Sequence, residues 1–281
     1  MNFTAAVTKF IAATRQSGFR SALAKTGRKI AGRLCGQHPH IDPVYAHRLK
    51  LLADLSHRLN FTVRYGPFAG MTLAPETFWA GAYRAPMLLG MYEREVLEAI
   101  ADRQTGRGVF IDLGAADGFY GVGVLRAGWF ATSYCYEIDP GAQAVIARNA
   151  AANGVADRVI IRGEATSGFY RDIPPRAIDG AIILIDIEGG EFDLLDAATL
   201  DALRTATIIV ETHPWVADGD ANCCALQARA AATHRVTRFD MGPRDPGQFE
   251  ELKSWSDTDR WLICSEDRPR LMTWLLLEPN D

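Results

Sequence analysis

The sequence predicts an α/β fold built on one doubly wound, mostly parallel sheet. Five short apolar runs alternate with segments of helical periodicity, and each run ends in a polar residue. Parallel strands bring their carboxyl ends to one edge of a sheet, so we expect these polar residues to form a site there. The predicted strands are residues 109–113, 133–138, 158–163, 181–185 and 207–210.

A basic extension over residues 1–36 precedes the rest of the chain. Residues 1–34 hold seven Lys and Arg and no acid, so with a total net charge of −4 the remaining chain carries −4 − 7 = −11. Apolar residues recur there at helical spacing, which indicates an amphipathic helix that could contact an anionic membrane surface. A helix docked on the body, a frayed terminus and a transit peptide are the alternatives. The acidic body disfavours nucleic-acid binding.

An accessory segment over residues 37–105 is expected on the substrate side of the sheet. It contains a predicted helix, a small hairpin around a glycine-containing turn, and a second helix: residues 45–60, 61–73 and 91–100. Tyr92 and Glu93 begin the second helix, and from there both side chains could reach the ligand edge. An acid also complements a helix N-terminus, so Glu93 has a purely structural explanation as well.

The first strand of the sheet passes into a turn of small residues, Gly114-Ala-Ala-Asp-Gly118, before a helical pattern. Gly114, Ala115 and Gly118 let the backbone approach a ligand beside the unpaired N–H groups of the helix start. Asp112 is expected at the mouth of this turn. A carboxylate there would repel a pyrophosphate, which favours a cationic, phosphate-free adenosyl ligand. S-adenosylmethionine fits that description.

The second and third strands supply further polar residues for such a ligand. Glu137 lies 25 residues after Asp112, with Ile138 beside it, and is placed to accept hydrogen bonds from both hydroxyls of a ribose. The third strand delivers Glu164 and Ala165 to the same edge, where an adenine amino group would lie. These positions together predict an adenosyl site that spans the ends of three strands.

The fourth strand ends in Asp186-Ile-Glu-Gly-Gly-Glu191. Together with the segments 111–118 and 136–140, this motif resembles the FkbM family of class I S-adenosylmethionine-dependent methyltransferases, over about residues 92–215. The resemblance implies a Rossmann-like, mostly parallel sheet of seven strands with helices on both faces. It also implies S-adenosylmethionine as cofactor and O-methylation of a hydroxyl on a sugar, glycan or secondary metabolite.

A hydroxyl acceptor must lose its proton as the methyl group arrives, and the ends of the fourth and fifth strands carry groups that could accept it. His213 or Glu188 is expected to be the base, and Asp186 to orient the donor or the acceptor. Alternatively, Asp186, Glu211 and His213 could hold a divalent cation. Their spacing forms no closed ligand pattern, so we expect a metal-independent enzyme.

The methyltransferase domain is expected to cover residues 106–281. After the fifth strand we expect a helix, a sixth strand and a seventh strand: residues 220–233, 235–239 and 271–277. The family resemblance implies that the seventh strand runs antiparallel. The polar loop 242–247 and the segment 255–266, which is ambiguous between helix and strand, could border the acceptor pocket. No repeat or heptad pattern points to a particular oligomer.

Composition is typical of a globular enzyme. The 281 residues contain no apolar run long enough to span a bilayer, and the five cysteines form no Cys-x-x-Cys pair. We therefore expect a cytoplasmic location without structural zinc. The same turn would also serve a nicotinamide-dependent oxidoreductase, and an inactive nucleoside-binding module is the non-enzyme alternative. The presence of Asp112, Glu137, Asp186 and Glu188 together favours an enzyme.

Overall fold

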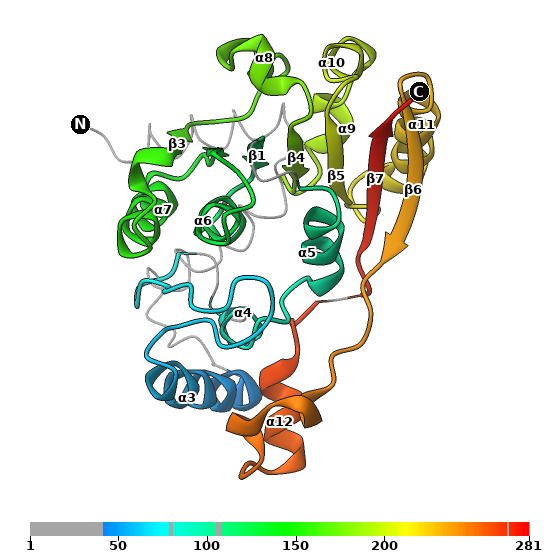
Figure 1. Ribbon diagram of the computed structural model, residues 1–281. Helices are drawn as coiled ribbons and strands as arrows, with labels where there is room; N and C mark the ends of the chain where they lie inside the picture. The colour runs from blue at the N-terminus through cyan, green and yellow to red at the C-terminus, as the bar shows by residue number, and fades with distance from the viewer. Residues whose placement is uncertain (1–41, 79–80, 82, 105–107, 269, 281) are drawn as a thin grey trace, which may run out of the picture.

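A computed structural model of the protein describes residues 42–78, 81, 83–104, 108–268 and 270–280. The predicted basic extension therefore lies outside the described residues. The described part is a seven-stranded sheet with helices on both faces, and a smaller helical group lies beyond one end of the sheet (Figure 1). No helix in the described ranges is both long and apolar enough to cross a bilayer.

The strand order of the sheet is β3-β2-β1-β4-β5-β7-β6. All neighbours pair in parallel except β7, which pairs antiparallel with both β5 and β6. The predicted fold class is therefore confirmed, including the antiparallel seventh strand. The strands are β1 (Val109–Leu113), β2 (Thr132–Tyr136), β3 (Val159–Arg162), β4 (Ile182–Ile185), β5 (Thr207–Thr212), β6 (His234–Asp240) and β7 (Thr273–Pro279).

Alternating strand residues fill two separate apolar cores, one on each face of the sheet. Phe110 and Leu184 face one core, whereas Ile111 and Ile183 face the other. The first core is covered by α5 (Arg94–Ala101), α6 (Phe119–Arg126) and α7 (Pro140–Ala152). The second is covered by α8 (Pro175–Ile178), α9 (Glu191–Leu194), α10 (Ala197–Ala202) and α11 (Gly219–Ala230).

A third, smaller core joins the accessory segment to the C-terminal part of the chain. It packs α3 (Pro43–Arg58) and α4 (Arg84–Leu88) against α12 (Asp257–Cys264), so the ambiguous segment 255–266 is helical. Leu55 and Ile263 are fully buried in this contact. Short 3-10 turns complete the chain: η1 (Ala156–Arg158), η2 (Phe169–Asp172), η3 (Pro246–Gln248) and η4 (Glu250–Leu252).

Two predicted elements of the accessory segment differ in the structure. The hairpin over residues 61–73 is present but short: Thr62 pairs antiparallel with Thr72, and the N–H groups of Val63 and Leu73 donate to Met71 and Phe61 across it. It ends at Arg64, whose N–H donates to Leu88 of α4. The second helix begins at Arg94 rather than at residue 91. Glu93 has a φ of 45°, in the left-handed region, which ends helical continuity on its N-terminal side.

The direction of β7 determines which loops lie at the carboxyl edge of the sheet. Because β7 runs antiparallel to β5, its first residue, Thr273, pairs with Thr212 at the carboxyl end of β5. Asp240, the last residue of β6, also pairs with Thr273. The loop before β7 and the loop after β6 therefore both lie at the edge where the parallel strands end.

Candidate active site at the carboxyl edge of the sheet

The turn after β1 brings the backbone of two strand ends into close contact. Gly114 has a φ of 90°, and a Cβ atom there would lie 1.8 Å from the carbonyl oxygen of Asp186, so only glycine fits. Gly118 has a φ of 79° and forms the N-cap of α6. Ala115 is buried against the first core. The space beside Gly114 is filled by Asp186, and the N–H groups of Gly114 and Ala115 both donate to the carbonyl oxygen of Tyr136, so the predicted approach of this backbone to a ligand stays a prediction.

Three non-glycine residues at this edge adopt the left-handed backbone region. Glu93, Ala116 and Glu188 have φ values of 45°, 48° and 55°. Such conformations cost about 1–3 kcal/mol each and persist where the surrounding structure imposes them, most often at functional sites. They stand in three separate loops, which makes this edge the leading candidate for the site.

Glu137 is held by backbone donors at the end of β2. Its Oε2 accepts a hydrogen bond from Ala116 N–H at 2.9 Å, and its Oε1 accepts one from Asp139 N–H at 2.8 Å. A carboxylate offers about four lone-pair sites, so about two acceptor positions are left for other donors. Burial raises the pKa of this carboxyl, and the two backbone N–H groups oppose that rise.

Apolar side chains are exposed next to Glu137. Ile138 is 50% exposed, and Phe78 of the accessory segment is 48% exposed. The ring of Phe78 lies so close to the start of α7 that a Cβ on Gly141 would be 3.0 Å from it. At the end of β3, Glu164 is exposed and Ala165 is half-buried. Phe78 was absent from the sequence prediction, because an aromatic residue in an irregular segment carries no motif.

Asp112 lies beneath the turn rather than at its mouth. It is 2% exposed, and its Oδ2 accepts a hydrogen bond from Gly121 N–H at 3.0 Å, in the first turns of α6. Burial raises the pKa of Asp112 to about 8. The predicted repulsion of a pyrophosphate by Asp112 is therefore corrected, because a carboxyl that is mostly neutral near pH 7 repels an anion weakly.

Replacing Asp112 with asparagine is expected to flatten the pH dependence of stability. With a pKa of about 8 in the folded protein against an ordinary value of 3.8, the folded state binds more protons than the unfolded state between those values. Stability therefore falls as pH rises through this window, by up to about 1.4 kcal/mol per pH unit for one group. Urea unfolding at pH 5, 6, 7 and 8 measures this slope. Equal slopes in the variant and the parent protein would reject the prediction, and Asp201→Asn serves as an exposed control.

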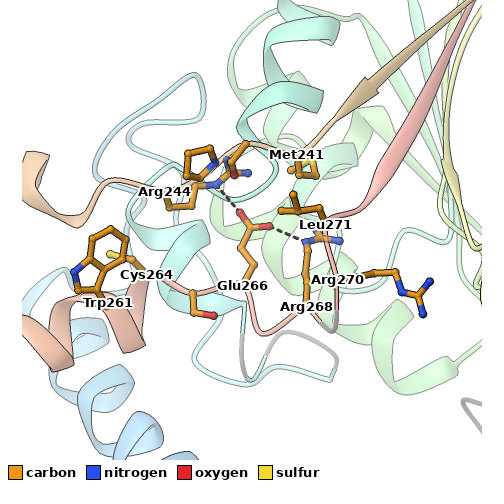
Figure 2. Close-up of a pocket in the computed structure, with 11 residues that line it drawn as sticks. Met241, Arg244, Trp261, Cys264, Glu266, Arg268, Arg270 and Leu271 are labelled. Carbon is orange, nitrogen blue, oxygen red and sulfur yellow. Dashed lines mark hydrogen bonds and ion pairs between the residues drawn. The ribbon is translucent and has the colours of Figure 1, made fainter.

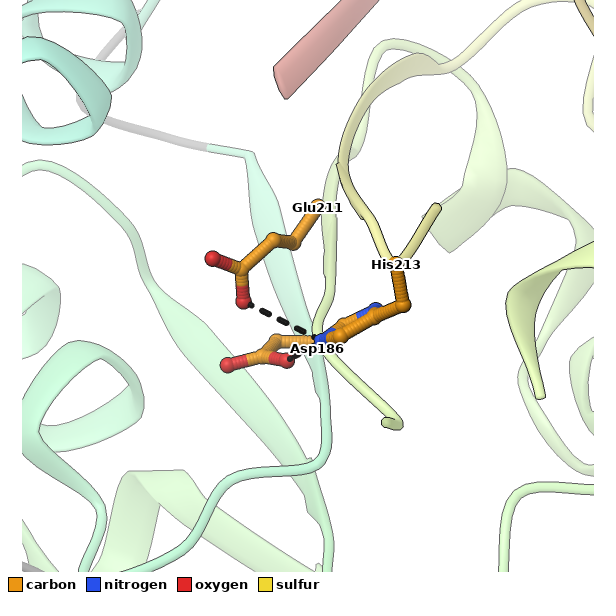
Figure 3. Close-up of side chains that lie close together, drawn as sticks. All are labelled: Asp186, Glu211 and His213. Atoms are coloured by element: carbon orange, nitrogen blue, oxygen red, sulfur yellow. Dashed lines mark ion pairs between the residues drawn. The ribbon is translucent and has the colours of Figure 1, made fainter. Parts of the chain in front are cut away.

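The ends of β4 and β5 bring two of the predicted catalytic residues, Asp186 and His213, together with Glu211. His213 Nε2 lies 3.5 Å from Asp186 Oδ1 and 3.6 Å from Glu211 Oε2, and Figure 3 shows both carboxylates directed at the imidazole. On the other side of the ring, His213 Nδ1 lies 2.9 Å from Glu191 Oε1. Glu188 is at the periphery: its side chain is 64% exposed and its Oε2 lies 4.0 Å from Nε2.

The pKa of His213 reflects these neighbours. Burial lowers the pKa of the imidazole, but the hydrogen bond to Glu191 and the negative charge of Asp186 outweigh it, so the pKa is raised above 6.5. The acids around the ring therefore favour its protonated form.

Arg268, from the loop before β7, joins the buried acids of the site. Its guanidinium donates to Glu211 at 2.9 Å, to Glu266 at 2.9 Å and to Glu93. Tyr120 O–H also donates to Glu93, at 2.5 Å. Burial raises the pKa of Glu93 and of Glu211, and the positive charge of Arg268 opposes both shifts. Sequence reasoning did not identify Arg268.

Tyr92 and Glu93, predicted at the donor site, both belong to the Arg268 network. The guanidinium carbon of Arg268 lies 5.8 Å from the centre of the Tyr92 ring. Both carboxylate oxygens of Glu93 accept bonds from described protein groups, one from Arg268 and one from Tyr120. In this structure, these two residues therefore support the site from within the protein.

A pocket of about 430 Å³ opens beside this network (Figure 2). Glu266 lies in its wall between Arg244 and Arg268, to which it is bonded at 2.8 and 2.9 Å. The loop after β6 and the helix α12 both line it, and the prediction that the segments 242–247 and 255–266 border an acceptor pocket stays a prediction. The lining residues are Met241, Gly242, Pro243, Arg244, Trp261, Cys264, Ser265, Glu266, Arg268, Arg270 and Leu271.

Neither a protein-family model nor a curated protein matches this chain. Among solved structures, the Streptococcus pneumoniae protein Sp1610 in complex with S-adenosyl-L-methionine is similar at 14% identity, with a TM-score of 0.43 over 66% of this chain and 73% of that protein. The B. subtilis M1A22 tRNA methyltransferase TrmK is similar at 10% identity, with a TM-score of 0.44 over 66% and 65%. The precorrin-6y C5,15-methyltransferase of Geobacter metallireducens GS-15 is similar at 13% identity, with a TM-score of 0.44 over 75% and 94%.

Proposed function

We propose that this protein is an S-adenosylmethionine-dependent methyltransferase that methylates a hydroxyl oxygen of a sugar, glycan or secondary metabolite. The observation that carries the proposal is the carboxylate of Glu137, held by two backbone N–H groups at the end of β2, opposite the close-packed Gly114 turn. A carboxylate in this position of a doubly wound sheet accepts the hydroxyl hydrogens of a ribose.

The neighbouring residues suit the other parts of an adenosyl donor. Ile138 and Phe78 offer exposed apolar surface for a base, and Glu164 and Ala165 stand at the next strand end. Gly114 and Gly118 let this turn pack closely against Asp186 and Ile146, so the ends of β1 and β4 and the helix α7 meet beside Glu137. S-adenosylmethionine supplies a methyl group that is already activated on its sulfonium. The protein's own task is to hold donor and acceptor in line and to exclude water.

The acceptor is proposed to enter from the pocket beside Arg268. That residue lines the pocket and also bonds to Glu211, so the pocket and the cluster at the ends of β4 and β5 are joined through one side chain. Carboxylates and an imidazole at this point suit an acceptor that must lose a proton, as a hydroxyl does. The net charge of −11 on residues 35–281 (−4 − 7) favours an uncharged acceptor over a polyanion such as nucleic acid.

Replacing Glu137 with alanine is expected to weaken donor binding by about 1.5–3 kcal/mol, because the ribose hydroxyls lose a charged acceptor. Calorimetric titration with S-adenosylhomocysteine measures this loss. Asp157→Ala is the control: it removes an exposed acid of the turn η1, directly before β3, and this variant should bind the ligand like the parent protein. Equal affinities in Glu137→Ala and the parent protein would refute the ribose assignment.

A labelled-donor assay tests the reaction itself. The full chain is incubated with S-adenosylmethionine carrying a ¹³C-methyl group and with panels of sugar, lipid-linked and small-molecule alcohols. The proposal predicts a methyl ether by NMR in at least one panel, and much less product with Glu137→Ala. Methyl transfer found only on nitrogen or carbon acceptors would overturn the hydroxyl assignment.

A further inference from the structure

We propose that Asp186, Glu211 and His213 bind a divalent metal cation at the ends of β4 and β5. Each residue offers one ligand atom, and these atoms all lie within 4.8 Å of one another. Figure 3 shows the two carboxylates and the imidazole converging on one point. Two carboxylate oxygens and one imidazole nitrogen form a mixed donor set that suits Mn²⁺ and neighbouring divalent ions. This inference departs from the metal-independent route expected from the sequence.

His213 is oriented as a metal-binding imidazole is. Its side chain is 2% exposed, and Nδ1 lies 2.9 Å from the carboxylate of Glu191, which itself is fully buried. That contact fixes the ring and directs Nε2 toward the cluster, as carboxylates do for metal-bound histidines. Nε2 lies 3.5 and 3.6 Å from the two acids, beyond the usual range of an N–H···O hydrogen bond. Direct hydrogen bonds to these acids therefore do not explain the position of the ring.

Asp186 supplies a second, independent observation. Its Oδ1 is buried and accepts no hydrogen bond from any described residue. A buried carboxylate oxygen without a partner is unfavourable. Because this oxygen faces His213 Nε2, a cation between the two atoms would satisfy both.

Glu211 divides its two oxygens between two neighbours. Oε1 accepts a bond from Arg268 at 2.9 Å, while Oε2 faces His213 at 3.6 Å. Arg268 therefore positions the carboxylate and leaves one oxygen for a ligand. An octahedral ion with bonds of about 2.1 Å places adjacent ligand atoms about 3 Å apart. The observed separations of 3.5 and 3.6 Å need to shorten by only about half an ångström.

The site is open on one side. The side chain of Asp186 is 34% exposed and that of Glu188 is 64% exposed, with Glu188 Oε2 at 4.0 Å from His213 Nε2. Remaining coordination positions are therefore accessible to water or to an acceptor oxygen. A bound divalent cation lowers the pKa of an oxygen acid. The acceptor hydroxyl would give its proton to Glu188 or water, and its oxygen would form the new C–O bond as the S–CH₃ bond breaks and the thioether leaves.

Cation binding does not depend on the proposed methyl transfer. The role of the cation in activating the acceptor hydroxyl rests on that proposed function. Titration of the metal-free full chain with Mn²⁺, followed by electron paramagnetic resonance, tests binding alone. We expect one saturable equivalent, with affinity at least tenfold weaker in Asp186→Asn and in His213→Ala. Asp201→Asn, an exposed acid elsewhere, should bind like the parent protein. Absence of saturable binding, or equal binding in Asp186→Asn, would overturn the inference.

Two further measurements show whether a negative result comes from a misfolded variant, from a wrong methyl-transfer proposal or from a wrong cation site. Saturating Mn²⁺ should raise the melting temperature of the parent protein and leave that of Asp186→Asn unchanged, and an equal rise in both proteins would also contradict the site. A cooperative thermal transition of metal-free Asp186→Asn, at a melting temperature close to that of the metal-free parent protein, shows that the variant is folded. If the parent protein binds Mn²⁺ but not S-adenosylhomocysteine, the proposed function fails while the cation site stands.

Discussion

Replacing Arg268 with alanine is expected to lower the free energy of unfolding by about 3–5 kcal/mol, as found when one partner of a buried ion pair is removed. Its guanidinium bonds to Glu93, Glu211 and Glu266, which are 1%, 3% and 8% exposed. Without Arg268 these acids repel one another in a poorly solvated region. The loss should shrink at low pH, because protonation of the acids removes the repulsion.

Urea unfolding at pH 5 and pH 8 measures this effect. The matched control is Arg270→Ala, two residues away, because Arg270 is exposed and its guanidinium lies over the ring of Trp215. We expect that control to change stability by less than about 1 kcal/mol. If both variants lose the same stability, the Arg268 network does not hold the site together.

Replacing His213 with alanine is expected to lower turnover about 10²–10⁴-fold and to leave donor affinity nearly unchanged. His213 stands between Asp186 and Glu211 and does not belong to the proposed ribose or adenine contacts. In the proposed cation site, His213 holds the ion that acidifies the acceptor hydroxyl, and its loss removes that activation. The effect therefore belongs to the chemical step.

Single-turnover kinetics and calorimetry with S-adenosylhomocysteine separate these two quantities. His234→Ala is the matched control, because His234 is also a buried histidine. Its Nε2 lies 3.2 Å from the carbonyl oxygen of Ala206, just before the first residue of β5, whereas the site lies at the last residues of β5. The His234→Ala variant should be less stable but should keep the single-turnover rate of methyl transfer. Full turnover in His213→Ala would remove His213 from the mechanism.

The parallel direction of the first five strands could be predicted because each is an apolar run that alternates with a helical segment. The strand order was not predicted, and the antiparallel seventh strand was expected from the family resemblance. Glu137, Gly114 and His213 were found from the same apolar runs, since they stand at strand ends and topology brings strand ends together. The start of α5 was predicted three residues early, because the left-handed conformation of Glu93 has no local sequence signal.

Arg268 could not have been found from sequence, because its role depends on partners far along the chain. Glu211 lies 57 residues before it and Glu93 lies 175 residues before it. The contacts exist only because β7 runs antiparallel and returns its N-terminal loop to the site. Asp112 shows the same limit: it was expected at the mouth of the turn, whereas its burial beneath the turn and its raised pKa follow only from the packed fold.

Thermal unfolding with competing ligands tests the central claim of an S-adenosylmethionine site most directly. A ligand at about 100 times its dissociation constant stabilises the folded state by roughly 2.7 kcal/mol. We expect S-adenosylhomocysteine to raise the melting temperature of the full chain, Glu137→Ala to reduce that rise, and NAD and NADP to produce none. A rise with NAD or NADP and none with S-adenosylhomocysteine would contradict the account and indicate a nicotinamide-dependent oxidoreductase.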